Sequence, residues 1–280
     1  MYIFNTIKET TDYLSRQKEQ GLRIGFVPTM GALHEGHLSL MRKAKEENNL
    51  LAVSVFVNPI QFNNAQDLDK YPRDLEKDKR LLEQVGCDVL FAPEVEEMYP
   101  EPETTTYDFG PLEQVMEGAS RKGHFNGVAV VVRKLFDIIG PHKAYFGEKD
   151  FQQMAIIKEL VRKYELPVGI VPCPIVREPD GLAMSSRNER LTPEKRKTAP
   201  EIHRILNEAR NKTGSLNPAE LKDRVTKEIE KEPLFRLDYF EIADDTYLQP
   251  VKSWNRNTGT MGFAAVFLGN IRLIDNIRFI

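Results

Sequence analysis

The chain has 280 residues, 41% of them hydrophobic, which suffices for a sizeable core and makes two domains the expected organisation. Its 39 basic and 42 acidic residues give a formal net charge of −3, so the sequence lacks the basic excess that general nucleic-acid binding requires. We therefore expect small-molecule partners and no nucleic acid.

The N-terminus and the cysteines indicate where the protein works. Residues 1–14, MYIFNTIKETTDYL, carry charges where a secretory signal has its apolar core, and no run approaches the roughly 18 apolar residues of a membrane span. Cys87 and Cys173 lie in apolar, strand-like runs, where a free cysteine behaves as a small hydrophobic residue. We expect a cytoplasmic protein with no membrane association and no disulfide framework.

Short apolar runs alternate with amphipathic stretches over the first part of the chain. Strands buried on both faces are predicted at 23–27, 50–57, 87–92, 143–146 and 168–173, and helices between them include 73–86 and 149–164. Repeated βα units predict a doubly wound parallel sheet. The fold class is therefore α/β, with a Rossmann-like nucleotide-binding domain over residues 1–176.

The pattern changes after residue 176. Two charged helices at 193–212 and 217–231 precede strand-like segments at 237–244, 261–269 and 271–277. We expect a smaller α+β domain over residues 177–280 that acts as a lid. Its hinge is predicted near 176–181, where Pro179 and Gly181 permit movement.

The stretch PTMGALHEGH, residues 28–37, follows the first predicted strand, and open parallel sheets bind ligands beyond the carboxyl ends of their strands. Gly31 and Gly36 have the spacing of a phosphate-binding G-x-x-x-x-G-K-[ST] loop, but His37 stands where that loop needs lysine. His34 and His37 are three residues apart, one fewer than in the zinc-protease motif H-E-x-x-H. Neither motif is present.

What remains is a histidine pair near the N-terminus of a helix that is expected to begin at Glu35 or Gly36. Backbone N–H groups and the positive end of the helix dipole favour an anion there. Imidazole N–H groups could hold nucleotide phosphates and stabilise charge on a transferring phosphoryl group. The spacing alone also fits two surface histidines on a first helical turn, and the neighbouring glycines favour the functional interpretation.

A second polar stretch, FGEKDFQQ, ends one predicted strand and opens a helix. Lys149, Asp150 and Gln153 would lie at the same edge of the sheet as the histidines. Asp150 could instead serve only as a helix cap, and Lys149 could be a solvated surface side chain. The stretch therefore allows both a binding role and a structural one.

A third polar stretch, LAMSSRNERL, follows the last strand of the first predicted domain. Its two hydroxyls and Arg187 suit phosphate oxygens, because a guanidinium makes paired hydrogen bonds to them. Ser186 and Glu189 also have the spacing of a capping box. Taken alone, this stretch does not decide between the two interpretations.

Together, the HxGH and Met-Ser-Ser-Arg sequences resemble the signature pair of the adenylate-forming nucleotidyltransferase superfamily, which includes the class I aminoacyl-tRNA synthetases. VPTMGALHEGHLSLM, VFVNPIQF, KYPRD, GHFNGV, FGEKDFQQ and VREPDGLAMSSRN follow one another in order. With them the chain resembles the pantothenate synthetase (pantoate–β-alanine ligase) family over nearly its full length. Beyond about residue 195 the resemblance rests on the length of the chain and the general pattern of its sequence, because no family motif is present there. Ile60 stands where many members carry threonine, which leaves Gln61 in register.

The resemblance implies ATP-dependent condensation of (R)-pantoate with β-alanine, in pantothenate and coenzyme A biosynthesis. Pantoyl adenylate is the implied intermediate, and pantothenate, AMP and pyrophosphate are the products. Mg²⁺ would accompany the ATP phosphates. The family is generally dimeric, so a homodimer is expected, and the strand at 50–57 could provide its interface.

Carried over by motif, the resemblance implies catalytic roles for His34, His37 and Lys149. The residues implied to bind ATP are Pro28, Thr29, Met30, His34, His37, Gly147, Lys149, Asp150, Val176, Met184, Ser185, Ser186 and Arg187. Those implied to bind pantoate are Met30, Asn58, Gln61, Tyr71, Arg121 and Gln153. No magnesium ligand is identified. His124 is expected to be a packed loop histidine, and His142 and His203 are expected at the surface.

Three other functions share part of this pattern. A nucleotidyltransferase that keeps AMP on its product has the histidine motif but does not need the two-glutamine pantoate pocket. An aminoacyl-tRNA synthetase also forms adenylates, but the balanced charge and small C-terminal part leave little room for tRNA. A nucleotide sensor that binds ATP without turnover stays open on the sequence alone.

Overall fold

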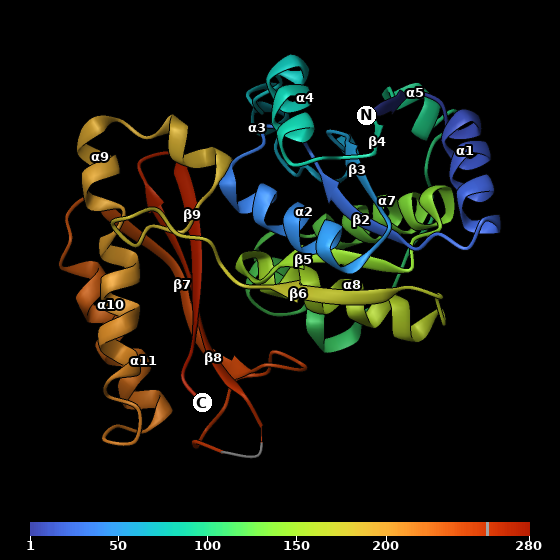
Figure 1. The fold of residues 1–280 in the computed structure, drawn as a ribbon. Helices are drawn as coiled ribbons and strands as arrows, with labels where there is room; N and C mark the ends of the chain where they lie inside the picture. Colours follow the sequence, from blue (N-terminus) through green and yellow to red (C-terminus); the bar gives the residue numbers. More distant parts are fainter. Residues whose placement is uncertain (256–257) are drawn as a thin grey trace. The chain divides into compact units, whose positions relative to one another are not determined.

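The computed structural model describes residues 1–255 and 258–280, which divide into two compact units (Figure 1). Unit 1 contains Met1–Gly110, Ser120–Glu148 and Ile156–Pro174. Unit 2 contains Ile175–Ile280 and two earlier segments, Pro111–Ala119 and Lys149–Ala155. Lys149, Asp150 and Gln153 therefore belong to the same unit as the Met-Ser-Ser-Arg stretch, and the domain boundary near residue 176 stays a prediction.

The sheet of unit 1 is parallel and has the strand order β1-β4-β3-β2-β5-β6. Its strands are β1 (Tyr2–Phe4), β2 (Ile24–Thr29), β3 (Leu50–Val55), β4 (Val89–Phe91), β5 (Lys143–Gly147) and β6 (Gly169–Cys173). From β2 the chain winds outward through β3 and β4, then returns to the other side of β2 for β5 and β6. The predicted doubly wound α/β fold is confirmed, and its strand order reverses between β2 and β5.

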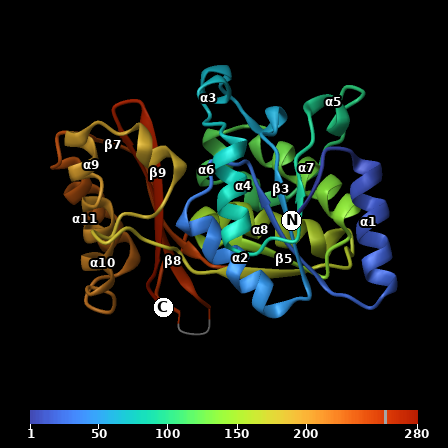
Figure 2. The same ribbon diagram turned by 45° about the horizontal axis from the view of Figure 1, so that its top comes forward.

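Helices connect these strands. They are α1 (Ile7–Glu19), α2 (Glu35–Glu47), α3 (Ala65–Asp69), α4 (Leu75–Gln84), α5 (Val95–Met98), α6 (Met116–Ser120), α7 (His124–Ile139) and α8 (Phe151–Lys163), with short 3₁₀ turns η1 (Pro59–Gln61), η2 (Gly110–Glu113) and η3 (Glu148–Asp150). Met41 of α2 and Leu82 of α4 pack with Val27, Leu51 and Leu90 of the sheet, all of them excluded from solvent. Helix α1 lies beside α7 (Figure 2).

The burial of two strands departs from the sequence-based expectations. Residues 51–54 of β3 are fully buried between β2 and β4 and cannot contribute to the dimer interface predicted at 50–57, which otherwise stays a prediction. Strand β6 is not buried on both faces, because it is an edge strand with its first and fourth residues exposed. Its Pro172 has no N–H to donate, which an edge position tolerates.

Unit 2 has a three-stranded antiparallel sheet in the order β7-β8-β9. Its elements are η4 (Ser186–Arg190), α9 (Pro193–Thr198), α10 (Glu201–Arg210), α11 (Pro218–Glu230), β7 (Phe235–Asp244), β8 (Thr260–Leu268) and β9 (Ile271–Arg278). Helices α10 and α11 pack along this sheet (Figure 1) and bury Leu206, Val225 and Val266. The predicted α+β character is confirmed.

The helix predicted at 193–212 is broken into α9 and α10. Pro200 lies at the break, and proline both lacks the N–H for an intrahelical bond and crowds the preceding turn. The predicted helix at 217–231 forms as α11, where Asn217 and Glu220 make a capping box. Among the described residues, no helix has the length and apolar character needed to span a membrane.

Candidate functional site

The loop after β2 is fixed by buried polar groups of unit 1. The Thr29 hydroxyl donates to the Ser54 carbonyl at 2.7 Å and accepts from the Gly31 N–H at 3.2 Å. Gly31 and Ala32 both have positive φ, +78° and +49°, a conformation that costs a residue with a side chain free energy. The loop therefore needs an external support to hold its shape.

That support is Asp78 of α4, which is 1% exposed. Its Oδ2 accepts from the Ala32 N–H at 3.0 Å and its Oδ1 from the Leu33 N–H at 2.8 Å. Burial raises the pKa of Asp78 above its usual value, and the two N–H bonds oppose that shift. The sequence reasoning missed this residue. Its signal was a carboxylate one helical turn before the buried Leu82, on the apolar face of α4.

The two histidines come together at the N-terminus of α2, which begins at Glu35 as predicted. Their ring centroids are 4.0 Å apart, and the His34 N–H donates to Nδ1 of His37 at 3.3 Å. Because Nδ1 accepts this bond, a neutral His37 carries its proton on Nε2. The pair lies after β2, next to the point where the strand order reverses and where such folds bind ligands.

Three residues predicted to bind pantoate also come together in unit 1. The Gln61 side-chain amide donates to Sδ of Met30 at 3.2 Å, and the Asn58 amide donates to Oε1 of Gln61 at 3.0 Å. Asn58 also donates to the Gly127 carbonyl at 3.1 Å and accepts from the Tyr99 hydroxyl at 2.8 Å. Asn58 is 1% exposed, and its amide contact helps to hold the Gln61 side chain in place.

Arg121 reaches Gln61 through His124. Nη1 of Arg121 lies 3.0 Å from Nε2 of His124, and Nδ1 of His124 lies 2.8 Å from the Gln61 carbonyl oxygen. Because a guanidinium only donates and a carbonyl only accepts, His124 is neutral with its proton on Nδ1. His124 is buried as expected, but it is the first residue of α7 and connects two predicted site residues. Tyr71 is also buried and packs edge-on against Phe62, beside Gln61.

Gly127 sets how closely α7 approaches Gln61. A Cβ at this position would lie 2.5 Å from the Ile60 carbonyl oxygen and 2.8 Å from Cα of Gln61. Since these are backbone atoms, Gly127→Ala must displace η1 and cost about 1–3 kcal/mol. If Gln61 binds pantoate as predicted, the KM for pantoate should rise about tenfold, in line with a loss of about 1.4 kcal/mol, while the KM for ATP should stay unchanged in steady-state assays.

Gly169→Ala is the matched control. Its Cβ would meet only ordinary contacts, 3.6 Å from the His142 carbonyl oxygen and 3.8 Å from Lys143. Wild-type KM values are expected for this variant. A Gly127→Ala enzyme with an unchanged KM for pantoate would show that Gln61 does not depend on this close contact.

Several predicted ATP-binding residues belong to strand ends or lie just beyond them. Pro28 and Thr29 end β2, and Gly147 ends β5 with open space where a Cβ would stand. Lys149 and Asp150 follow in η3, and the Lys149 ammonium lies 3.4 Å from a carboxylate oxygen of Asp150. The Lys149 side chain is 16% exposed and that of Asp150 is 48% exposed, so the lysine is the more enclosed of the two.

The two adjacent glutamines of α8 have different environments. Gln152 is 5% exposed and its amide donates to the Leu112 and Val115 carbonyls at 2.7 and 2.9 Å. It also accepts from the Glu117 N–H at 3.0 Å, so Gln152 is used entirely in holding the 111–119 segment. Gln153 is only partly buried, and its predicted role in binding stays a prediction.

The Met-Ser-Ser-Arg stretch is partly buried and follows a hairpin in unit 2. The Met184 N–H donates to the Val176 carbonyl at 3.0 Å, so these two predicted site residues pair across the hairpin. Ser185 caps η4 by accepting from the Arg187 N–H at 3.3 Å. The alternative capping box of Ser186 with Glu189 is therefore wrong, because η4 begins one residue earlier than that spacing assumes.

His142 and His203 were expected at the surface, and both are partly exposed, but each also lies close to a polar group of the protein. Nδ1 of His142 accepts from the Ile24 N–H at 3.0 Å, at the start of β2. His203 is partly buried, and its Nδ1 lies 3.9 Å from Asp275. Burial and neighbouring positive charge lower the pKa of both rings, which favours the neutral form. Over residues 1–255 and 258–280, no group of three or more His, Cys, Asp or Glu side chains could hold a metal ion.

Comparisons with known proteins agree on one family. A family model described as pantoate-beta-alanine ligase matches residues 2–278. The chain is 52% identical to a pantothenate synthetase of Bacteroides fragilis over 279 residues, which cover 100% of this chain and 99% of that relative.

Solved structures give the same result. The pantothenate synthetase of Thermus thermophilus matches with a TM-score of 0.93 and 45% identity, covering 100% of this chain and 99% of that one. A pantoate-beta-alanine ligase from Francisella tularensis, solved in complex with beta-gamma ATP and beta-alanine, matches with a TM-score of 0.84 and 37% identity. That match covers 100% of this chain and 98% of the other.

Proposed function

The chain belongs to the pantoate–β-alanine ligase family, and from this premise we propose that it makes pantothenate by an ATP-dependent, two-step reaction through pantoyl adenylate. The family membership predicted from the motifs is confirmed, and with it the joining of pantoate to β-alanine. The use of ATP and the route through an adenylate form the proposed part. The observation that supports it best is the histidine pair at the N-terminus of α2.

In the first step, a carboxylate oxygen of (R)-pantoate attacks the α-phosphorus of ATP, and the bond to the β-phosphate oxygen breaks to release pyrophosphate. In the second step, the amine of β-alanine attacks the acyl carbon, AMP leaves, and the amine nitrogen loses a proton. Activation is needed because a carboxylate has no good leaving group. The first step requires in-line positioning and neutralisation of phosphate charge more than covalent work by the protein.

The residues divide between these tasks. His34 and His37 contact the ATP phosphates, and Nε2–H of His37 is the donor that its tautomer makes available. Lys149 bridges phosphate and carboxylate, while Ser185, Ser186 and Arg187 hold the β- and γ-phosphates. Further ATP contacts come from Pro28, Thr29, Met30, Gly147, Val176 and Met184, and Asp150 accepts from the ribose hydroxyls.

Pantoate binds to neutral amides in this proposal. Gln61 and Gln153 hydrogen-bond its hydroxyl and carboxylate, and Pro28 and Met30 contact its methyl groups. Gln61 is supported by two amide contacts, to Met30 and to Asn58, so its orientation is fixed before substrate arrives. Asn58, Tyr71 and Arg121 complete this group as residues around Gln61.

The remaining parts of the proposal concern the metal and the assembly. Mg²⁺ enters as the ATP complex and is held mainly by phosphate oxygens. We further propose a homodimer, a cytoplasmic location and a lid role for residues 177–280. Pro179 and Gly181 form a tight hairpin turn, and hinge movement there is part of this proposal.

The proposal is tested by exchange of labelled pyrophosphate into ATP. Exchange should require pantoate and proceed without β-alanine, because adenylation is complete and reversible before the amine binds. Addition of β-alanine should then yield pantothenate and AMP in equal amounts. Formation of ADP, or exchange that needs β-alanine, would contradict the adenylate route, and ATP binding without turnover would favour the sensor function.

A further inference from the structure

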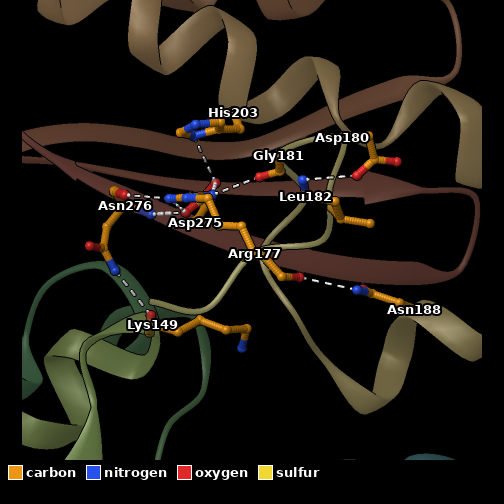
Figure 3. A network of polar contacts seen from close by, with 10 residues as sticks. Lys149, Arg177, Asp180, Gly181, Leu182, Asn188, His203, Asp275 and Asn276 are labelled. Atoms are coloured by element: carbon orange, nitrogen blue, oxygen red, sulfur yellow. Dashed lines mark hydrogen bonds and ion pairs between the residues drawn. The ribbon is translucent and has the colours of Figure 1, made fainter. Parts of the chain in front are cut away.

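Asp275 of β9 forms an ion pair with Arg177, and Asn276, the next residue of β9, contacts Lys149 (Figure 3). Through these contacts the strand is linked to two of the segments that the proposed function assigns to ATP. Asp275 accepts from Nη1 and Nη2 of Arg177 at 2.7 and 2.9 Å, a paired geometry that fixes the guanidinium plane. The Asp275 side chain is 5% exposed and that of Arg177 is 21% exposed.

Arg177 also holds a hairpin, in addition to its contacts with Asp275 and the Asn276 carbonyl. Its Nη1 also donates to the Gly181 carbonyl at 3.0 Å, across the turn (Figure 3). The hairpin is closed by the Glu178 N–H to the Leu182 carbonyl at 2.8 Å. Gly181 has a φ of +94°, and a Cβ there would lie 2.9 Å from the His203 ring, so only glycine fits this turn.

The hairpin in turn fixes both ends of the Met184–Arg187 segment. Ala183 pairs with Arg177 in the hairpin, and its carbonyl accepts from the side-chain amide of Asn188 at 3.1 Å. Asn188 is 9% exposed and lies directly after Arg187. The Met184–Arg187 segment, which would hold the β- and γ-phosphates, therefore lies between Ala183 and Asn188, and both of these residues are held in place by hydrogen bonds.

The next residue of β9 reaches the other ATP segment. The Asn276 side-chain amide donates to the Lys149 carbonyl at 3.1 Å (Figure 3). The backbone N–H of Asn276 donates to Oδ1 of Asp275 at 2.7 Å, which ties the two side chains to one short piece of strand. Lys149 and the hairpin thus share a common support within unit 2.

We propose that Asp275 and Asn276 are positioning residues that hold Lys149 and the Met184–Arg187 segment in register for the ATP phosphates. This inference rests on the proposed function. Stability alone does not account for the pair, because even a fully buried ion pair contributes little more than a well-packed apolar pair of the same volume, and this one is only partly buried. The polar contacts of Asp275 and Asn276 fix both proposed phosphate-binding segments to one strand. An apolar pair could not do this, because it makes no hydrogen bonds to those segments.

The activity test uses Asp275→Asn and Asn276→Ala, with Asp238→Asn as the matched control. Asp238 accepts from Nε and Nη2 of Arg272 at 3.0 and 2.7 Å in the same sheet, but contacts neither ATP segment. Both test variants should raise the KM for ATP about tenfold, the effect of losing one well-placed contact, with the KM for pantoate unchanged. Equal changes in both KM values, or the same change in Asp238→Asn, would overturn the proposal.

Amide hydrogen exchange measures how firmly the hairpin is held, whether or not the protein is active. It therefore tests the support by Asp275 separately from the proposed function. Asp275→Asn should increase exchange at the amides of 178–188 about tenfold or more, while amides of β7 and β8 keep their wild-type rates. This readout needs no turnover, so it tests the support even if the wild type fails to exchange pyrophosphate. Unchanged protection of 178–188 would show that Asp275 does not hold the hairpin.

Discussion

Alanine in place of His37 is expected to slow the pantoate-dependent exchange of pyrophosphate into ATP by about 10²- to 10³-fold, the usual effect of removing one donor to transition-state charge. His37 stands on the first turn of α2, where its ring lies against that of His34. The bond from the His34 N–H occupies Nδ1, so in the proposed mechanism the donor to phosphate is Nε2–H. His34→Ala should fall in the same range.

Two amide substitutions separate the donor from the loop contact. In His37→Gln, an N–H group lies near the original position of Nε2, whereas in His37→Asn an oxygen near Nδ1 can still accept from the His34 N–H. If donation to phosphate is the role of His37, the Gln variant should retain more exchange activity than the Asn variant. The reverse order would assign His37 to support of the loop.

His142→Asn is the control for these variants. His142 is also a histidine whose Nδ1 accepts a backbone N–H, but it does so at the opposite end of β2 from the loop. Asparagine can replace that acceptor, so this variant should exchange pyrophosphate at the wild-type rate. A large loss in His142→Asn would mean that disturbing β2, and not loss of a phosphate contact, explains the His37 variants.

The sequence predicted most of the fold because its signals are local. Apolar runs such as 23–27 and 143–146 are buried strands, and the capping box of Asn217 and Glu220 starts α11 where expected. One error comes from an effect beyond a single element, because whether β6 is covered or exposed depends on its place at the sheet edge. The other has a local cause, since Pro200 itself breaks a helix whose charge pattern continues across it.

The candidate site shows the same limit. His34, His37 and Gln61 could be predicted as site residues because they stand in contiguous motifs. Asp78 and Asp275 were missed because each lies far along the chain from the loop it supports, one in a helix and one in a strand. Supporting residues of this kind are recognised only once the backbone groups that they bind are known.

Asp78→Asn is expected to give a folded protein with at least tenfold lower exchange activity. The amide offers one oxygen in place of two, so one of the Ala32 and Leu33 N–H groups faces an NH₂ group and stays buried without an acceptor. Such a group costs about 1–3 kcal/mol of unfolding free energy. The loop carries Ala32 at positive φ, so loss of its support also shifts His34, and an error of about 1 Å in a catalytic group can cost 10²-fold.

Asp74→Asn tests whether the effect belongs to the buried carboxylate. Asp74 is the exposed N-cap of the same helix, and asparagine caps as well as aspartate does, so this variant should match the wild type in urea unfolding and in exchange. Asp78→Asn should differ from it in both measurements. If Asp78→Asn lost stability but kept full exchange activity, the Asp78 contacts would serve the packing of α4 alone, and the conformation of the histidine loop would have to be stabilised by Thr29 and the start of α2.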